Sequence, residues 1–432
     1  MATRNRVIYQ SEAVYTTVDA GISGNQCAAG AVKDLQRVQS ANYSFNVGRT
    51  DVNQFGQLGA IDRIITESPS VSFDASYVLA SMTNERRLGF YVTPSGENSP
   101  FRSCITDLVD STNDAYQRNF YILNAKEGKD ADVTQAVESS GQYESIIGIG
   151  NAGLTSYSVE GSVGGFPTVS VSAEGMNMGF HEVTSVGVSG TNESTRPPFY
   201  ISGINPVINP VDGQRVFPNQ TTRCVADATS ARVALPAPTG NAGGINAAKQ
   251  AAGEISVLRP GDIRLFLDKQ TDDAISTAAV ATDMTTPDYA GADIADAHLQ
   301  SFNISFDLSR SPIEQLGTKF AYARLIDFPI TVSLGVDAIV SDLTTGSLAE
   351  VIDCDGLFDA RIQLNSPECG ATHGAAVAAN YILKGIKLDS QSFSMGMGDN
   401  QSVSLSFSSQ IGGPEQSGLG LFMSGYTGHI NG

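Results

Sequence analysis

The strongest constraint in this sequence is that the chain repeats itself. Residues 39–65 align without gaps onto residues 300–326 at a constant offset of 261, and 11 of these 27 positions are identical. Further matches follow in the same order, pairing residues 71–73 with 332–334, 121–124 with 362–365, 156–159 with 392–395 and 169–172 with 403–406. Such a repeat means that one supersecondary unit is built twice. The 432 residues are therefore predicted to fold as two tandem copies of one unit.

Each copy is predicted to consist mainly of β-strands. Residues 42–47 (NYSFNV) and 303–308 (NISFDL) alternate strictly between polar and apolar side chains, which is the period of a strand with one buried face. Later in each copy, two alternating runs flank a turn, so each copy is predicted to end in a long hairpin. These hairpins cover residues 157–173, with a turn at 164–167, and residues 393–408, with a turn at 398–400.

One helix is predicted between the strands of each copy. Residues 101–116 carry apolar side chains at near-helical spacing with Ser103 as the N-cap, and residues 347–352 are the shorter counterpart. One helix against a mostly antiparallel sheet makes an α+β unit. The predicted fold class is mainly β, with two tandem domains of β-sandwich or half-barrel type, each carrying a flanking helix and a long β-hairpin.

The repeat and the proline content predict the domain boundaries. Residues 1–195 form the first domain and residues 260–416 form the second, which repeats the first. Between them, residues 196–259 are rich in proline and glycine and are predicted to be an ordered linker or an inserted arm. Residues 417–432 are predicted to be a C-terminal extension that docks on a neighbour or frays.

Composition indicates a protein that buries much of its surface in an assembly. Charged residues make up only 16% of the chain, where soluble domains average about 25%. Interface cores are depleted in charge, whereas a monomer needs charge to stay soluble, so large subunit contacts are expected. Asp and Glu number 45 against 26 Lys and Arg, giving a net charge of -19 that disfavours a groove for nucleic-acid phosphates.

The sequence shows no membrane or secretion signal. No run approaches the roughly 18 apolar residues of a membrane helix. The first residues, MATRNR followed by Val7, Ile8 and Tyr9, lack the apolar core of a secretory signal. We therefore expect a protein that is made and kept in a cytosol-like compartment and has no membrane partner.

Residue types that carry out catalysis or bind cofactors do not occur at the required spacings. The odd number and wide separation of the cysteines predict free buried thiols rather than disulfides or a zinc site. These cysteines are Cys27, Cys104, Cys224, Cys354 and Cys369. The four histidines lack a metal-binding spacing, and no G-x-S-x-G motif marks a nucleophile. The predictions are no enzyme activity, no catalytic residues, no cofactor and no metal.

Two short motifs have ordinary structural interpretations. Residues 148–153 match G-x-G-x-x-G, but the sequence after them is typical of a strand, not of the helix that a dinucleotide site requires. We predict a glycine-rich turn at this place. Residues 353–356 (DCDG) supply too few oxygen ligands for a calcium loop and are also predicted to form a turn.

Four arginines recur at equivalent places in the two copies. Arg49 matches Arg310, and Arg63 matches Arg324. They could mark a shared ligand contact, but positions kept in both copies more often hold an interface or the fold together, and we favour that interpretation. Asp62 and Asp327 lie nearby in sequence and are candidate ion-pair partners.

With these features the chain resembles the tail tube protein of long-tailed bacteriophages. The resemblance rests on the repeated strand at 42–47 and 303–308, on the hairpins at 157–173 and 393–408, and on the helix between strands. It is a resemblance of architecture and covers nearly the whole chain except the proline-rich linker. It implies tail-tube-like domains, a structural role in the virion, and assembly in the host cytoplasm.

The resemblance also implies the form of the assembly. Tube units form stacked sixfold rings around a DNA channel, and a duplicated unit lets three chains make a pseudo-hexameric ring, with six chains as the alternative. The hairpins of successive units would pair edge to edge into a closed inner barrel. The implied partners are other copies of the chain, a sheath if the tail is contractile, and the tape measure, baseplate and terminator proteins.

An acidic lumen suits such a tube, because it repels phosphate and lets DNA pass without specific binding. The candidate lumen-facing residues are Glu160, Glu174 and Asp399 of the two hairpins. The alternative function is a capsid-decorating or other β-rich structural protein of the virion or cell surface, which would form a compact trimer without axial polymerisation. A sheath protein is a further alternative, and an enzyme would need a pocket with perturbed titratable groups.

Overall fold

The structure is a computed structural model, and the prediction of a mainly β chain is confirmed. It shows one large antiparallel sheet and almost no helix among the residues that it describes. The described residues are 12–18, 32–66, 70–94, 102–109, 118–125, 143–175, 177–182, 198–200, 207–208, 215–216, 232–234, 258–269, 297–313, 316, 323–340, 357–365, 377–394, 402–413, 416 and 418–425.

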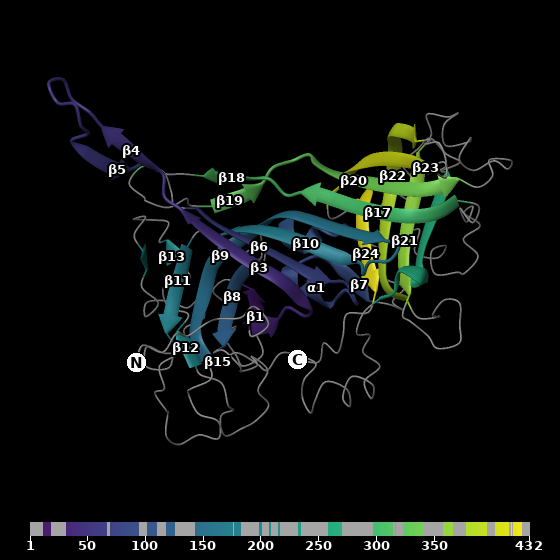
Figure 1. Cartoon of the computed structure of the whole chain (residues 1–432), viewed down its shortest axis with the longest axis horizontal. Helices are drawn as coiled ribbons and strands as arrows, with labels where there is room; N and C mark the ends of the chain where they lie inside the picture. Colours follow the sequence, from purple (N-terminus) through teal and green to yellow (C-terminus); the bar gives the residue numbers. More distant parts are fainter. Residues whose placement is uncertain are drawn as a thin grey trace, which may run out of the picture.

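Eight strands form a central sheet in the order β3-β6-β10-β9-β17-β20-β23-β22 (Figure 1). Every second residue of β6, β10 and β23 is buried, as the alternating sequence predicts. The eight strands are β3 (Val38–Asn46), β6 (Ser70–Val78), β9 (Tyr143–Ser162), β10 (Thr168–Gly175), β17 (Ala297–Asp307), β20 (Ile330–Val340), β22 (Val377–Ser394) and β23 (Ser402–Ile411).

The long strands β9 and β22 each belong to two sheets. The N-terminal part of β9 pairs with β8 and β11, and the N-terminal part of β22 pairs with β21 and β24. Strands β1, β2, β16 and β7 complete these two side sheets. The side strands are β1 (Glu12–Val18), β2 (Val32–Asp34), β7 (Val92–Pro94), β8 (Arg118–Ala125), β11 (Asn177–Glu182), β16 (Ile263–Lys269), β21 (Phe358–Asn365) and β24 (Gly420–Gly425). Strand β24 falls in the segment that the sequence assigned to a C-terminal extension.

Four small antiparallel pairs lie outside these sheets. Two of them, β4 with β5 and β18 with β19, continue from the ends of β3 and β17 as hairpin arms. The other two, β12 with β15 and β13 with β14, lie in the proline-rich segment. The bounds are β4 (Arg49–Val52), β5 (Asp62–Ile65), β12 (Pro198–Tyr200), β13 (Val207–Ile208), β14 (Arg215–Val216), β15 (Arg232–Ala234), β18 (Arg310–Ile313) and β19 (Ala323–Ile326).

The pattern of strand pairing occurs twice along the central sheet. The order β3-β6-β10-β9 is followed by β17-β20-β23-β22. The register shifts recur as well: Gln39 is an extra residue opposite β6, and Gln300, 261 residues later, is an extra residue opposite β20. Thr155 and Asp389 are the extra residues opposite β10 and β23. Because the bulges fall at equivalent places, the two halves of the sheet are built in the same way.

The bulges correct one detail of the sequence alignment. Thr155 and Asp389 are 234 residues apart, so Ser156 on β9 is equivalent to Ser390 on β22. The sequence alignment instead matched Ser156 with Ser392, two residues further along. A slip of two residues keeps every side chain on the same face, so an alternating serine pattern cannot reveal it.

The helix prediction for residues 101–116 is wrong in extent within its described part. Within residues 101–116, the described part contains only the short helix α2 (Thr106–Val109), because residues 102–105 form a loop and turn. The buried Ser103 hydroxyl has no hydrogen-bond partner among the described residues, so the Ser103 side chain does not cap the helix. The helix α1 (Thr83–Leu88) was not predicted. Residues 347–352 lie outside the described residues.

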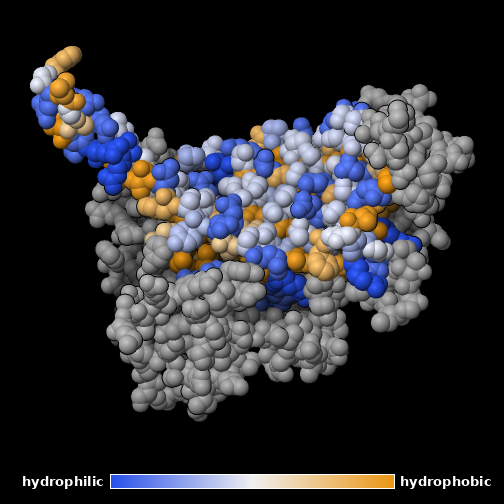
Figure 2. All heavy atoms as spheres, viewed as in Figure 1, coloured by the Kyte–Doolittle hydropathy of each residue, from blue (hydrophilic) through white to orange (hydrophobic). Residues whose placement is uncertain are grey.

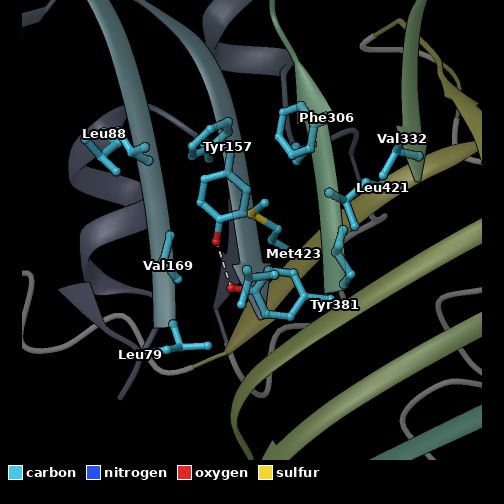
Figure 3. Close-up of a cluster of buried hydrophobic side chains, with 14 of the residues drawn as sticks. Leu79, Leu88, Tyr157, Val169, Phe306, Val332, Tyr381, Leu421 and Met423 are labelled. Atoms are coloured by element: carbon cyan, nitrogen blue, oxygen red, sulfur yellow. Dashed lines mark hydrogen bonds between the residues drawn. The ribbon is translucent and has the colours of Figure 1, made fainter. Parts of the chain in front are cut away.

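One core lies between the central sheet and the side sheets, and aromatic rings occupy its middle. Tyr157 on β9 and Phe306 on β17 have ring centroids 5.4 Å apart (Figure 3). Phe90, which follows α1, lies edge-on to both, at 5.0 Å and 5.9 Å. All three rings are buried, and each contributes roughly 1.5–3 kcal/mol by leaving water. The two halves of the sheet therefore share one hydrophobic core.

A carboxyl group is buried at the same junction. Glu85 on α1 is fully buried, and its Oε1 accepts hydrogen bonds from the hydroxyls of Tyr77 (2.8 Å) and Tyr157 (3.2 Å). The Tyr157 hydroxyl also bonds to Tyr381 on β22 at 2.8 Å, the dashed line in Figure 3. Burial raises the pKa of Glu85 to about 7, because desolvation outweighs the hydrogen bonds that lower it.

Stability is therefore expected to fall as the pH rises toward neutrality. The unfolded chain ionises Glu85 near pH 4.5 and the folded chain near pH 7, so the contribution is complete below pH 4.5 and is lost as the pH rises through 7. The loss is about 3 kcal/mol, at about 1.4 kcal/mol per pKa unit. Glu85→Gln should remove this pH dependence of the unfolding free energy, measured with urea in acidic and in mildly alkaline buffer.

The matched control is Glu160→Gln, which changes an exposed acid of the same chain. It should leave the pH dependence of stability as it is in the unaltered protein. A Glu85→Gln protein that still loses stability between the two buffers would show that another group is responsible.

Candidate assembly interface

One face of the central sheet is polar across its whole width. Cross-strand partners share a face, so the register collects the polar half of each alternating strand on one exposed surface. Figure 2 shows this surface as broad and mostly weakly hydrophilic. One row carries a serine on each of seven neighbouring strands: Ser40, Ser76, Ser170, Ser158, Ser305, Ser333 and Ser408. The face offers many hydroxyl groups and few charges.

The charges on this face are mostly negative. Exposed carboxylates stand on four of its strands: Asp74, Glu160, Asp307 and Asp337. Within the described parts of the eight strands, the only lysine or arginine on the same face is Lys387, opposite Ser408 at one end of the row. Since the acids outnumber this base, the surface presents a negative field to any ligand.

Two of the three predicted lumen-facing acids lie on this face. Glu160 is exposed and accepts a hydrogen bond from the Thr168 hydroxyl (3.1 Å). Glu174 lies on the same face of β10 but is one-third exposed and forms an ion pair with Arg324. Asp399 lies outside the described residues.

The two halves of the chain are joined by direct pairing of β9 with β17. The register runs from Ser162 opposite Ser301 to Ser156 opposite Asp307. Strand β9 is thus paired on both sides along this stretch, by β10 and by β17. We call this intramolecular pairing the seam. It turns two four-stranded sheets into one continuous sheet of eight strands.

The seam leaves two matching edges open. Among the described residues, β3 pairs only with β6, and residues 387–394 of β22 pair only with β23. By the repeated pairing, β3 is equivalent to β17 and β22 is equivalent to β9. Tyr43 and Phe45 on β3 are 39% and 50% exposed, whereas the equivalent Ile304 and Phe306 on β17 are buried. The open edge of β3 therefore lacks the cover that the seam gives to β17.

The repeated arginines lie on the two hairpin arms. In the second half, Arg310 donates from Nε to the Leu154 carbonyl oxygen (2.9 Å), and the buried Arg324 forms its ion pair with Glu174. Gly153 makes room for this contact, because a Cβ there would lie 2.6 Å from the Arg310 Nε. The β18–β19 arm is thus held against β9 and β10. We call Gly153 and Glu174, which receive the two arginines, the socket. Sequence reasoning missed the socket, because only the strand register brings Gly153 and Glu174 together.

The equivalent arginines of the first half lie on the β4–β5 arm, which projects away from the sheet (Figure 1). Arg49 and Arg63 are exposed. The side chain of Arg63 forms an ion pair with Asp51 (2.8 Å) and not with the predicted partner Asp62, which accepts from the Arg63 backbone N–H (2.7 Å). The other predicted partner, Asp327, accepts a hydrogen bond from the Ser311 hydroxyl.

Other sequence motifs also have a place in the structure. Residues 148–153 lie inside β9, so the predicted glycine-rich turn is wrong and no helix follows that could hold a dinucleotide. Cys104 is a buried free thiol, and the other four cysteines lie outside the described residues. In the part of the chain that is described, no group of His, Cys, Asp and Glu is placed to hold a metal. In the same part, no helix has the length and apolar character to cross a membrane.

Glu174→Gln is expected to loosen the β18–β19 arm. The neutral amide leaves the Arg324 guanidinium buried without its counter-charge, which costs about 1–3 kcal/mol of unfolding free energy. Amide hydrogen exchange in β18 and β19 should become faster. Asp74→Asn is the control, because it removes an exposed acid from the same face and should change neither quantity. Unchanged exchange in β18 and β19 of the Glu174→Gln protein would contradict the socket.

No protein-family model matches this chain, and no curated protein matches it either.

Proposed function

We propose that this chain is a structural virion protein that polymerises into stacked rings and forms the tail tube of a long-tailed bacteriophage, an acidic channel for passage of the genome. The observation that carries the proposal is the seam together with the two open edges. The chain already pairs β9 with β17, and among the described residues no strand pairs with the second edge of β3 or of residues 387–394 of β22. A second copy can supply to each edge what the seam supplies inside the chain.

The internal register predicts the register between copies. In the seam, Ser158 on β9 lies opposite Ser305 on β17. The equivalent residues are Ser392 on β22 and Ser44 on β3, and both are exposed. Pairing β22 of one copy with β3 of the next therefore places Ser392 opposite Ser44. The sheet has an even number of antiparallel strands, so its two edge strands run in opposite directions. Pairing of β22 with β3 is therefore antiparallel, like the seam itself.

Repeated pairing closes a wide barrel. Three chains supply 24 central strands, since each chain has eight. Strands about 4.8 Å apart and tilted by about 40° then close a barrel roughly 48 Å across its backbone. Side chains on the inner face leave a channel of roughly 35–40 Å, which admits a duplex whose major groove alone is about 12 Å wide. Six chains per ring remain the alternative stoichiometry.

The polar face suits the lining of such a channel. A hydrogen bond between DNA and a serine hydroxyl can be replaced by one to water at little cost in free energy, and carboxylates repel phosphate. DNA would therefore slide through the channel without binding. The apolar face of the same sheet already packs against the side sheets, which leaves the polar face for the lumen. The partners proposed are other copies of the chain and the remaining tail proteins, in the virion and, during assembly, in the host cytoplasm. No catalytic role is proposed.

Negative-stain electron microscopy of the purified, concentrated protein tests the proposal. Hollow rings or tubes with pseudo-sixfold top views are expected. Compact monomers, or closed trimers without a channel, would contradict it and would favour a capsid-decorating protein.

Cross-linking tests the register between copies. Cysteines introduced as Ser44→Cys and Ser392→Cys should be joined between chains by a short bismaleimide, giving covalent multimers on a denaturing gel. The control pairs Ser44→Cys with Lys387→Cys, which lies five residues away on the same strand, about 17 Å along it. Equal cross-linking of both pairs, or none of the first pair in assembled protein, would contradict the proposed register.

A further inference from the structure

The places that β9 and β22 offer to an arm differ in charge. By the repeated pairing, Lys387 on β22 stands at the position of Gly153 on β9, and Ser408 stands at the position of Glu174. Inside the chain this place holds an arm through a carboxylate, because Glu174 forms its ion pair with Arg324. The open edge of β22 has lost that carboxylate and gained an exposed lysine. An arm at this edge therefore meets a positive charge instead of a negative one.

The lysine also changes the space at this place. A Cβ at Gly153 would lie 2.6 Å from the Arg310 Nε, so the second arm can dock as it does only against a glycine. Lys387 has that Cβ and an exposed side chain on the polar face. Its neighbour in the seam between chains would be Arg49, the equivalent of Arg310. Like charge and lack of space both exclude Arg49 from the position that Arg310 takes.

The first arm has changed in the opposite sense. Its register is the same as that of the second arm: Asp51 lies opposite Arg63, as Pro312 lies opposite Arg324. Asp51 is therefore the equivalent of Pro312, at the offset of 261. Because cross-strand partners share a face, Asp51 lies on the face that carries the arginines. In the second arm, this is the face that contacts β9 and β10.

The carboxylate of Asp51 can accept a second cation. Its side chain is 48% exposed, although its Oδ1 is paired with the Arg63 Nε at 2.8 Å. A carboxylate has a second oxygen and about four lone-pair sites in total. The other acid of this arm, Asp62, lies opposite Val52 and thus on the other face. Only Asp51 is an acid on the arginine face of the described part of the arm.

The two changes are complementary. The sheet has a base where the socket has a glycine, and the arm has an acid where the second arm has a proline. Pairing of β22 with β3 in the register of the seam brings these two places together, because the base of the arm lies against the socket in the seam inside the chain. The flexible four-carbon stem of a lysine can span the remaining distance.

We infer that Lys387 of one copy forms an ion pair with Asp51 on the β4–β5 arm of the next copy in the same ring, so that the seam between chains is held by a contact of opposite polarity to the socket. The inference rests on the proposed function, and it assigns a residue pair to the contact between neighbouring chains. The arm that follows β17 has Pro312 at this place and cannot form the pair. Charge thus distinguishes the two seams, although their strand register is the same.

Carbodiimide coupling tests the contact directly, since it joins an amine to a carboxylate only where the two groups touch. Rings assembled from an equal mixture of isotope-labelled and unlabelled protein should give a peptide pair that joins Lys387 of one form to Asp51 of the other. Asp51→Asn should abolish this peptide pair. Asp62→Asn is the control, because it removes the same charge from the opposite face of the arm, and it should retain the pair.

A charge swap tests whether the ion pair holds the seam. Lys387→Asp alone and Asp51→Lys alone each bring like charges together. At a concentration where only part of the unaltered protein is assembled, each should lower the yield of the Ser44–Ser392 cross-link about fivefold. The double variant should restore the yield, because the pair is re-formed with reversed polarity. The thermal unfolding midpoint of the three unassembled variants should stay unchanged, since both side chains are exposed.

The outcomes separate the inference from the proposed function. Rings that retain the Ser44–Ser392 cross-link but give no Lys387–Asp51 peptide pair between chains would overturn the inference and leave the proposed rings in place. A double variant that cross-links as poorly as the single variants would do the same. Absence of rings and of the Ser44–Ser392 cross-link in protein without the charge substitutions would overturn both the inference and the proposed function.

Discussion

Edge-to-edge pairing of β9 with β17 is the interaction on which the rest of this structure depends. It satisfies backbone groups on two strands that would otherwise be open edges, and it brings Tyr157 and Phe306 together in the core. The halves consequently share one hydrophobic core, and Glu85, Tyr157 and Tyr381 form a buried hydrogen-bonded link across them. The same geometry leaves one edge of β3 and one edge of residues 387–394 of β22 without a neighbouring strand among the described residues.

The seam also divides the molecule into surfaces with different properties. On the core side, the alternating strands bury their apolar residues against the side sheets. On the other side they present serines and a few carboxylates, which explains how a chain with only 16% charged residues can still have a negatively charged surface. Large apolar side chains are exposed at the arms, at β3, next to β19 and at the β9–β10 turn. The polar face and the exposed apolar side chains therefore lie on different parts of the molecule.

The duplication has diverged where its two copies meet different neighbours. Gly153 and Glu174 form a socket for the second arm, and the equivalent Lys387 and Ser408 do not. A glycine is needed at the first place because any side chain would collide with Arg310. The seam inside the chain and a seam between chains would thus share their strand register, but only the seam inside the chain has the socket that holds the second arm.

The sequence by itself determined the repeat, the period-2 alternation and the two terminal hairpins, because strand periodicity and duplication are local patterns that survive without knowledge of neighbours. The sequence did not determine the register between paired strands. Tyr121 on β8 is equivalent to Arg361 on β21 and not to the Ile362 of the alignment, because β8 (RNFYILNA) has no regular alternation that would fix the match. Within the described residues 102–109, the predicted helix is limited to α2, because a near-helical spacing of apolar residues also arises in a packed loop.

Only the tertiary structure decided which copy of each repeated residue is used. Arg310 and Arg324 are held by β9 and β10, while Arg49 and Arg63, with the same local sequence, stand in solvent. The difference comes from the strand that lies next to each arm, and that neighbour is set by the pairing of segments far apart in the chain. Local sequence specifies strands and their faces, whereas edges, sockets and partners depend on contacts that no local pattern encodes.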